Sequence, residues 1–185
     1  MSIDPTWIAN ELTEIGALGC RAQEKGQRLE RLIQTIFSEI PGLEFDTADH
    51  RNFYQTEEID LLFWNDRERD GVHFLDCPLI IECKSSATPV SGRDVRYFAN
   101  TLSDKGRSSG ILVALAGVAG DDERVTAGIF HITAALLTRV SVLVVTREDL
   151  LSWRSASDIV HTLKRGLLSL VRDQVLAVDA AVRRR

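Results

Sequence analysis

Three short apolar runs separated by helical patterns constrain the fold of this chain more than any other feature. They lie at residues 77–84, 109–118 and 141–146, and the last two are continuous enough to predict strands buried on both faces. Helical periodicity lies between them, at residues 91–102 and 129–137. Because strands joined through such helices run parallel with right-handed crossovers, this order predicts an α/β protein whose sheet is at least partly parallel.

Further elements precede these runs. Asp4-Pro5 is a helix N-cap followed by proline at the first helical position, and an amphipathic helix extends from Gly26 until Pro41-Gly42 ends it. Residues 58–64 predict a strand that forms a hairpin with the 77–84 strand, across the polar turn NDRERDG.

Beyond Trp153 the sequence predicts one long helix with an apolar stripe. We therefore expect one domain at residues 1–154, with its core at 26–150, and a C-terminal helix at 155–185. The stripe keeps its spacing for longer than packing on one small sheet requires, which favours self-association; folding back onto the domain's own core is the other interpretation. The stripe consists of Val160, Leu163, Leu167, Val171, Val175, Val178 and Val182.

Charge and composition limit the partners of the chain. It has 22 Lys and Arg against 27 Asp and Glu, a net charge of −5, so nucleic acid would have to be bound at a local site. No apolar run approaches the ~20 residues that cross a bilayer, and the acidic N-terminus is unlike a secretory signal. We expect a soluble, cytoplasmic protein without a membrane partner. Its three cysteines, Cys20, Cys77 and Cys83, lack the paired spacing of a zinc site and are expected to be reduced.

Charged side chains interrupt the two hairpin strands. Glu82 and Lys84 stand two residues apart, so both leave the same face of their strand, where burial is costly without compensation. The preceding strand supplies Asp60, which lies beside Glu82 if the strands pair as a hairpin. Two carboxylates at one point repel each other unless a cation lies between them, and hard oxygen ligands select Mg²⁺ or Mn²⁺. We expect Asp60, Glu82 and the backbone carbonyl of Cys83 to ligate such a metal.

Lys84 beside a metal has a chemical use. A lysine there holds a water and offsets the charge that develops on a phosphate, as phosphodiester hydrolysis requires. The other interpretation is an ordinary buried salt bridge from Lys84 to Glu82 or Asp60. The residues alone leave both interpretations open.

The order Asp60, then Glu82-Cys83-Lys84 at the end of an apolar strand, resembles the motif of the PD-(D/E)xK nuclease superfamily. Residues 26–30, GQRLE, are similar to the glycine and the helix-borne glutamate that precede the core in Mrr-like restriction endonucleases. Two positions depart from the family pattern. Ile59 stands where proline is common, and Ile81 stands where Mrr-like members often carry Gln.

The resemblance covers residues 26–150 and implies a restriction-endonuclease-like, three-layer α/β/α core with a mixed central sheet and flanking N- and C-terminal helices. It implies a Mg²⁺- or Mn²⁺-dependent endonuclease that hydrolyses DNA phosphodiester bonds in defence or DNA processing. Asp60, Glu82 and Lys84 would be its catalytic residues. Glu30, at the border of the helix's buried stripe, would assist by orienting a water or a second cation.

A rival hypothesis assigns the same fold to the chain but no catalytic activity. The charged groups would then be an ion-pair network in a catalytically silent module that binds DNA or joins a larger defence complex. A homodimer through the C-terminal helix would place two sites against the two strands of a duplex.

A Rossmann-type nucleotide binder is disfavoured, because no glycine-rich loop follows a first strand. The basic residues after the lysine strand either hold phosphates or form a solvated helix face; they are Arg93, Arg96, Lys105 and Arg107.

Overall fold

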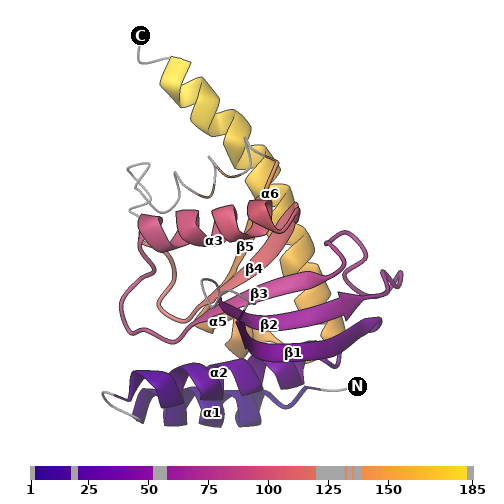
Figure 1. Cartoon of the computed structure of the whole chain (residues 1–185), viewed down its shortest axis with the longest axis vertical. Helices are drawn as coiled ribbons and strands as arrows, with labels where there is room; N and C mark the ends of the chain where they lie inside the picture. The colour runs from indigo at the N-terminus through magenta and orange to yellow at the C-terminus, as the bar shows by residue number, and fades with distance from the viewer. Residues whose placement is uncertain are drawn as a thin grey trace.

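A five-stranded sheet forms the centre of the computed structural model, which describes residues 3–17, 21–51, 58–119, 132, 135 and 139–182. Its strands follow one another across the sheet in the order β1-β2-β3-β4-β5. They are β1 (Leu43–Arg51), β2 (Glu58–Asn65), β3 (Leu79–Lys84), β4 (Ser109–Ala114) and β5 (Ser141–Val145). Helices pack on both faces of the sheet (Figure 1), which confirms the predicted α/β/α arrangement.

The sheet is mixed, as the order of the elements predicts. β2 pairs antiparallel with both β1 and β3, which confirms the predicted hairpin. β3, β4 and β5 run parallel, so their carboxyl ends meet at one edge of the sheet. Open α/β sheets bind their ligands outside that edge.

Two apolar cores hold the layers together. The helices are α1 (Pro5–Ala17), α2 (Ala22–Phe37), α3 (Gly92–Asp104), α5 (Arg147–Ser152) and α6 (Ala156–Val182). The larger core lies between the sheet and α1, α2 and α6, around Phe37, Phe63 and Trp153. The ring centroid of Phe37 lies 6.2 Å from that of Phe63, in a tilted contact, and 6.2 Å from that of Trp153, in an edge contact. The smaller core lies under α3, around Phe98 and Leu102. None of the described helices has the length and apolar character needed to cross a membrane.

Some elements differ from the expectations. α2 begins at Ala22, one turn before the expected start at Gly26. The sequence did not indicate this first turn, because the buried stripe of the helix starts only at Leu29. β1 is not among the expected strands; it lies at the edge of the sheet, and its sequence LEFDTADHR alternates too weakly to stand out. Of the helix expected at 129–137, Ile132 and Ala135 are helical and buried. The rest of that helix lies outside the described residues.

The fold-back interpretation of the C-terminal helix holds for the first turns of α6. Its first turns fold back onto the domain, where Val160 and Leu163 are buried. Farther along, Leu168 and Val171 are 70% and 56% exposed, and the helix extends away from the sheet (Figure 1). The side chains of the stripe beyond Arg172 lie outside the described residues. Packing on the domain's own core therefore accounts for the start of the stripe only.

Candidate active site

The register of β2 against β3 brings Asp60 next to Glu82. Leu61 pairs with Ile81, so one step further along the same antiparallel register Asp60 stands opposite Glu82. The backbone hydrogen bonds between β2 and β3 end here. The backbone N–H of Cys83 instead donates a hydrogen bond to Oδ2 of the Asp60 side chain at 2.7 Å. This bond holds the Asp60 carboxylate at the carboxyl end of β3.

Glu82 and Lys84 form an ion pair on the face of β3 that is turned toward α3. Nζ of Lys84 lies 2.5 Å from Oε1 of Glu82. Ile80, two residues earlier on the same face, is buried in the core under α3, so Glu82 and Lys84 lie where that core ends. The Glu82 side chain is 16% exposed and that of Lys84 is 39% exposed, so the pair lies at the surface end of the strand.

Lys84 is positively charged at neutral pH. Burial lowers the pKa of Lys84, but the carboxylate of Glu82 raises it through its charge and its hydrogen bond, and the charges of Asp60 and Asp94 raise it further. The net result is a pKa above the ordinary 10.5. Lys84 therefore acts as a hydrogen-bond donor and a positive charge, and it has no lone pair with which to accept a proton.

Cys83 stands between Glu82 and Lys84 in β3, with its thiol buried on the opposite face of the strand. Burial raises the pKa of this thiol well above its usual range, and the negative charges of Asp60, Glu30 and Glu82 add to the shift. The thiol is consequently neutral and a poor nucleophile. The pKa of this thiol therefore responds to the charge of each of these three carboxylates.

Glu30 lies on α2, and its charge acts on the Cys83 thiol. Its side chain belongs to the buried part of the helix, at 9% exposure, next to Leu29. Gly26 lies one turn earlier, and a Cβ at that position would be 3.6 Å from Oε1 of Glu30. The glycine therefore keeps the helix surface beside the carboxylate free of a side chain. The structure thus brings Asp60, Glu82 and Lys84 together at the end of β3. Glu30 is more deeply placed than the stripe border suggests, and its charge acts on the Cys83 thiol on the other face of the strand.

Asp94 is a charged neighbour that the sequence did not indicate. It lies in the first turn of α3, where its carboxylate accepts a hydrogen bond from Oγ of Ser91 at 2.7 Å. Its charge nevertheless acts on Lys84. The S-x-x-D spacing marks it in the sequence as a helix-capping residue, and only the approach of α3 to β3 connects it with the site.

The expected metal ligands offer hard oxygen donors. They are the carboxylates of Asp60 and Glu82 and the carbonyl of Cys83, which leaves an extended strand on the same side as the N–H that binds Asp60. In the part of the chain that the structure describes, no three His, Cys, Asp or Glu side chains are grouped as metal ligands. Mg²⁺ typically takes only one or two carboxylates and completes its shell with water and substrate oxygens. The residues present therefore fit Mg²⁺ better than Zn²⁺, which prefers nitrogen and sulfur.

This fold, a mixed sheet with helices on both faces, is that of a restriction-endonuclease-like protein. A family model for restriction endonucleases of the Mrr catalytic type matches residues 21–148, more than half of the chain. The chain belongs to this restriction endonuclease family, which confirms the resemblance seen in the sequence. The match contains Glu30, Asp60, Glu82 and Lys84 and leaves α1 and α6 outside. No curated protein matches the chain.

Proposed function

We propose that this protein is a Mg²⁺-dependent endonuclease that hydrolyses phosphodiester bonds of DNA, in defence or DNA processing. The observation that carries the proposal is the meeting of Asp60, Glu82 and Lys84 at the carboxyl end of β3. Membership of the restriction endonuclease family supports the nuclease chemistry. The hard oxygen donors support the choice of Mg²⁺.

Asp60 and Glu82 would hold the metal, together with the carbonyl of Cys83. The bound ion would supply charge stabilisation to the phosphate and lower the pKa of a water. The chain prepares the site in two ways. The N–H of Cys83 fixes the Asp60 carboxylate beforehand, and the charges that raise the pKa of the Cys83 thiol, including that of Glu30, also attract a cation.

Lys84 and Glu30 would act on the water and the phosphate directly. The ammonium group of Lys84 donates a hydrogen bond to the attacking water and offsets the negative charge that grows on the phosphate in the transition state. Because its pKa is raised, Lys84 does not take the proton. Glu30, whose charge acts on the Cys83 thiol, would accept a hydrogen bond from a water and assist its orientation.

The 2.5 Å ion pair between Glu82 and Lys84 favours a second candidate function. If the pair only satisfies two half-buried charges, the protein is a catalytically silent module that binds DNA or joins a larger defence complex. The two candidates differ in what Lys84 contributes. In the nuclease it contributes mainly to the rate, whereas in the silent module it contributes only to stability.

The C-terminal helix supports a further part of the proposal, which is self-association. The domain would occupy residues 1–154, and residues 155–185 would form the helix that pairs with a second copy. Leu168 and Val171 are apolar and exposed, three residues apart on α6, as residues of a helix–helix contact are. A two-fold dimer would bring two sites to the two strands of one duplex.

Incubation with supercoiled plasmid tests the function. We expect the full chain to nick and linearise plasmid in Mg²⁺ or Mn²⁺ and to lose this activity in excess EDTA. A matched single-stranded RNA substrate serves as the comparison for nucleic-acid type. Binding of DNA without cleavage in either metal would favour the silent module.

A further inference from the structure

The exposed face of α3 carries two arginines and a tyrosine, along with the carboxylates of Asp94 and Asp104. The buried side of this helix carries apolar residues such as Val95 and Phe98. On the outer side Arg96 and Tyr97 lie three and four residues after Arg93, so both adjoin Arg93 in one patch on the helix surface. Tyr97 is 58% exposed, so both its ring and its hydroxyl are open to a ligand.

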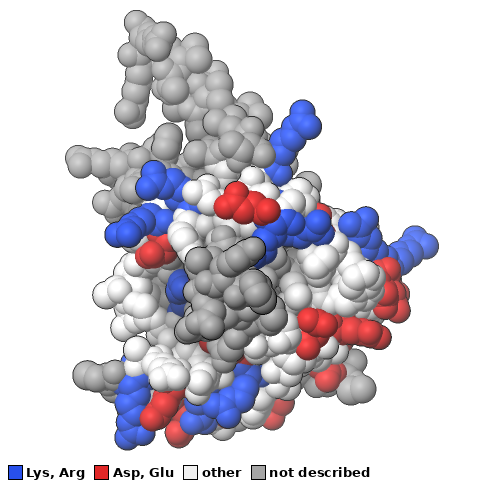
Figure 2. Space-filling model, in the orientation of Figure 1, with Lys and Arg blue, Asp and Glu red and all other residues white. Residues whose placement is uncertain are grey.

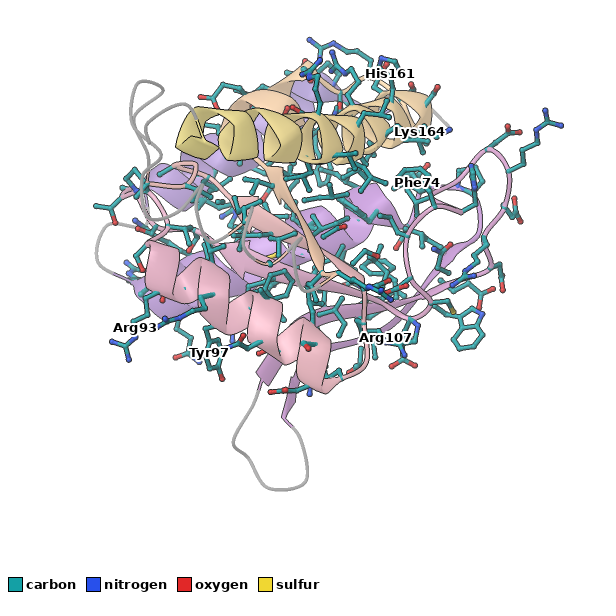
Figure 3. The ribbon with its side chains drawn as sticks, turned by 90° about the horizontal axis from the view of Figure 1, so that it is seen from above. Phe74, Arg93, Tyr97, Arg107, His161 and Lys164 are labelled. Atoms are coloured by element: carbon teal, nitrogen blue, oxygen red, sulfur yellow. The ribbon has the colours of Figure 1, made fainter. Side chains whose placement is uncertain are left out.

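The two arginines are available to a ligand. Among the residues that the structure describes, neither guanidinium has a hydrogen-bond or ion-pair partner, whereas Arg28 and Arg107 are both engaged. Figure 2 shows Lys and Arg side chains over the left-hand end of α3. In Figure 3 Arg93 and Tyr97 point away from the sheet at one end of this helix, and Arg107 lies at the other end.

The patch is fixed beside the candidate active site. A short loop connects Lys84 at the end of β3 to the start of α3. The charge of Asp94, in the first turn of α3, acts on the Lys84 ammonium. The loop is tied to the end of the sheet, because Val90 bridges to Val118 and the N–H of Leu115 donates to the carbonyl of Lys84 at 3.1 Å. A polymer that enters the site therefore passes close to the start of α3.

We propose that Arg93, Arg96 and Tyr97 bind the phosphate backbone of the DNA substrate next to the phosphate that is cut. This inference rests on the proposed function and adds to it the surface that positions the substrate. Guanidinium groups pair with phosphate oxygens through two parallel hydrogen bonds, and a tyrosine hydroxyl donates one hydrogen bond to such an oxygen. Contacts of this kind set the register of a duplex without reading its sequence.

The local patch also resolves the conflict with the net charge of −5. A protein with that charge does not coat nucleic acid through its whole surface. Two unpaired arginines and an exposed aromatic ring beside a phosphate-cutting site give the backbone a specific place to bind. A protein partner would need no such closeness to Lys84.

Binding of a fluorescent mixed-sequence duplex, measured by anisotropy over a series of salt concentrations, tests the proposal. The duplex is titrated without metal, so that cleavage does not interfere. We expect the double variant Arg93→Ala/Arg96→Ala to bind at least about tenfold more weakly at low salt. The slope of log K against log salt should fall by about 1.8, since each lost phosphate contact removes about 0.9. Tyr97→Phe should weaken binding by a smaller factor.

The matched control is Arg67→Ala/Arg69→Ala. It removes the same charge from exposed side chains in the loop at the opposite end of β3, so it should leave the slope within error of the wild type. If the wild type cleaves plasmid and the two double variants have equal slopes, the phosphate-binding role of the patch is wrong and the nuclease assignment stands. A wild type that binds no duplex would overturn both. An Arg93/Arg96-dependent slope without any cleavage would support the patch and contradict the nuclease.

Discussion

The backbone N–H of Cys83 donates a 2.7 Å hydrogen bond to Oδ2 of Asp60. The bond ties the acidic residue of β2 to the strand that carries Glu82 and Lys84. The position and the charge of this side chain can therefore be tested separately. An asparagine at position 60 retains an acceptor for the Cys83 N–H but loses the negative charge.

Asp60→Asn should lose divalent-metal binding and keep the fold. Calorimetry with Mn²⁺ should detect binding to the wild type and none to this variant. Asp60→Ala should also lose binding, and it should cost a further ~1–3 kcal/mol in urea unfolding because the Cys83 N–H loses its partner. Unchanged Mn²⁺ binding by Asp60→Asn would show that this carboxylate is not a ligand.

Lys84→Ala should lower stability only slightly. A half-exposed ion pair contributes about 1 kcal/mol or less to the free energy of unfolding. Arg28→Ala is the matched control, since Arg28 lies 2.8 Å from Glu11 with 32% and 25% of the two side chains exposed, close to the 39% and 16% of Lys84 and Glu82. Thermal melts should give similar small losses for both variants. A cost of about 3–5 kcal/mol for Lys84→Ala alone would instead identify a structural pair.

The pattern of the sequence predicted the sheet well and the site in part. Apolar runs and helical stripes carry the local signal for β3, β4, β5, α2 and α3, and the E-x-K spacing places Glu82 and Lys84 on one face whatever the partners are. The hydrogen bond from Cys83 to Asp60 and the effect of Asp94 on Lys84 depend on how β2 and α3 approach β3. Neither is encoded in the spacing of residues along one element. For the same reason the edge strand β1 and the early start of α2 gave no signal.

Cys83→Ala should leave cleavage within about threefold of the wild type. The site uses the backbone N–H and carbonyl of Cys83, both of which alanine keeps, and the buried thiol is neutral because its pKa is raised. The small cavity should cost about 1 kcal/mol of stability. A loss of cleavage in a folded Cys83→Ala protein would assign a chemical role to the thiol.

Above neutral pH, the stability contributed by Lys84 should change at the alkaline end only. Its pKa is raised above 10.5 in the folded protein, so the folded state holds the proton more tightly than the unfolded state. The contribution is fully present below pH 10.5 and is lost as the pH rises from there through the folded-state pKa. The difference in unfolding free energy between wild type and Lys84→Ala should therefore stay constant from pH 7 to 9. A decline within that range would contradict the raised pKa.

Leu168→Glu/Val171→Glu should abolish self-association without loss of the fold. Both side chains are exposed on α6, whereas a truncation at Trp153 would also remove the buried Val160 and Leu163. Sedimentation velocity should find a dimer for the wild type and a monomer of unchanged melting temperature for the variant. Arg165→Glu, an exposed change on the same helix, is the control for charge. A monomeric wild type at micromolar concentration would exclude the dimer.

The rate of plasmid cleavage by wild type, Lys84→Ala and Arg28→Ala in Mg²⁺, with protein in excess over DNA, tests the central claim most directly. The two variants lose ion pairs of similar exposure, but only Lys84 would contact the reacting water and phosphate. We expect Arg28→Ala to cut at nearly the wild-type rate and Lys84→Ala to be slower by about 10²–10³-fold, as for the loss of one transition-state donor. Equal rates for Lys84→Ala and the wild type, or no Mg²⁺-dependent cleavage by the wild type, would contradict the nuclease assignment of this site.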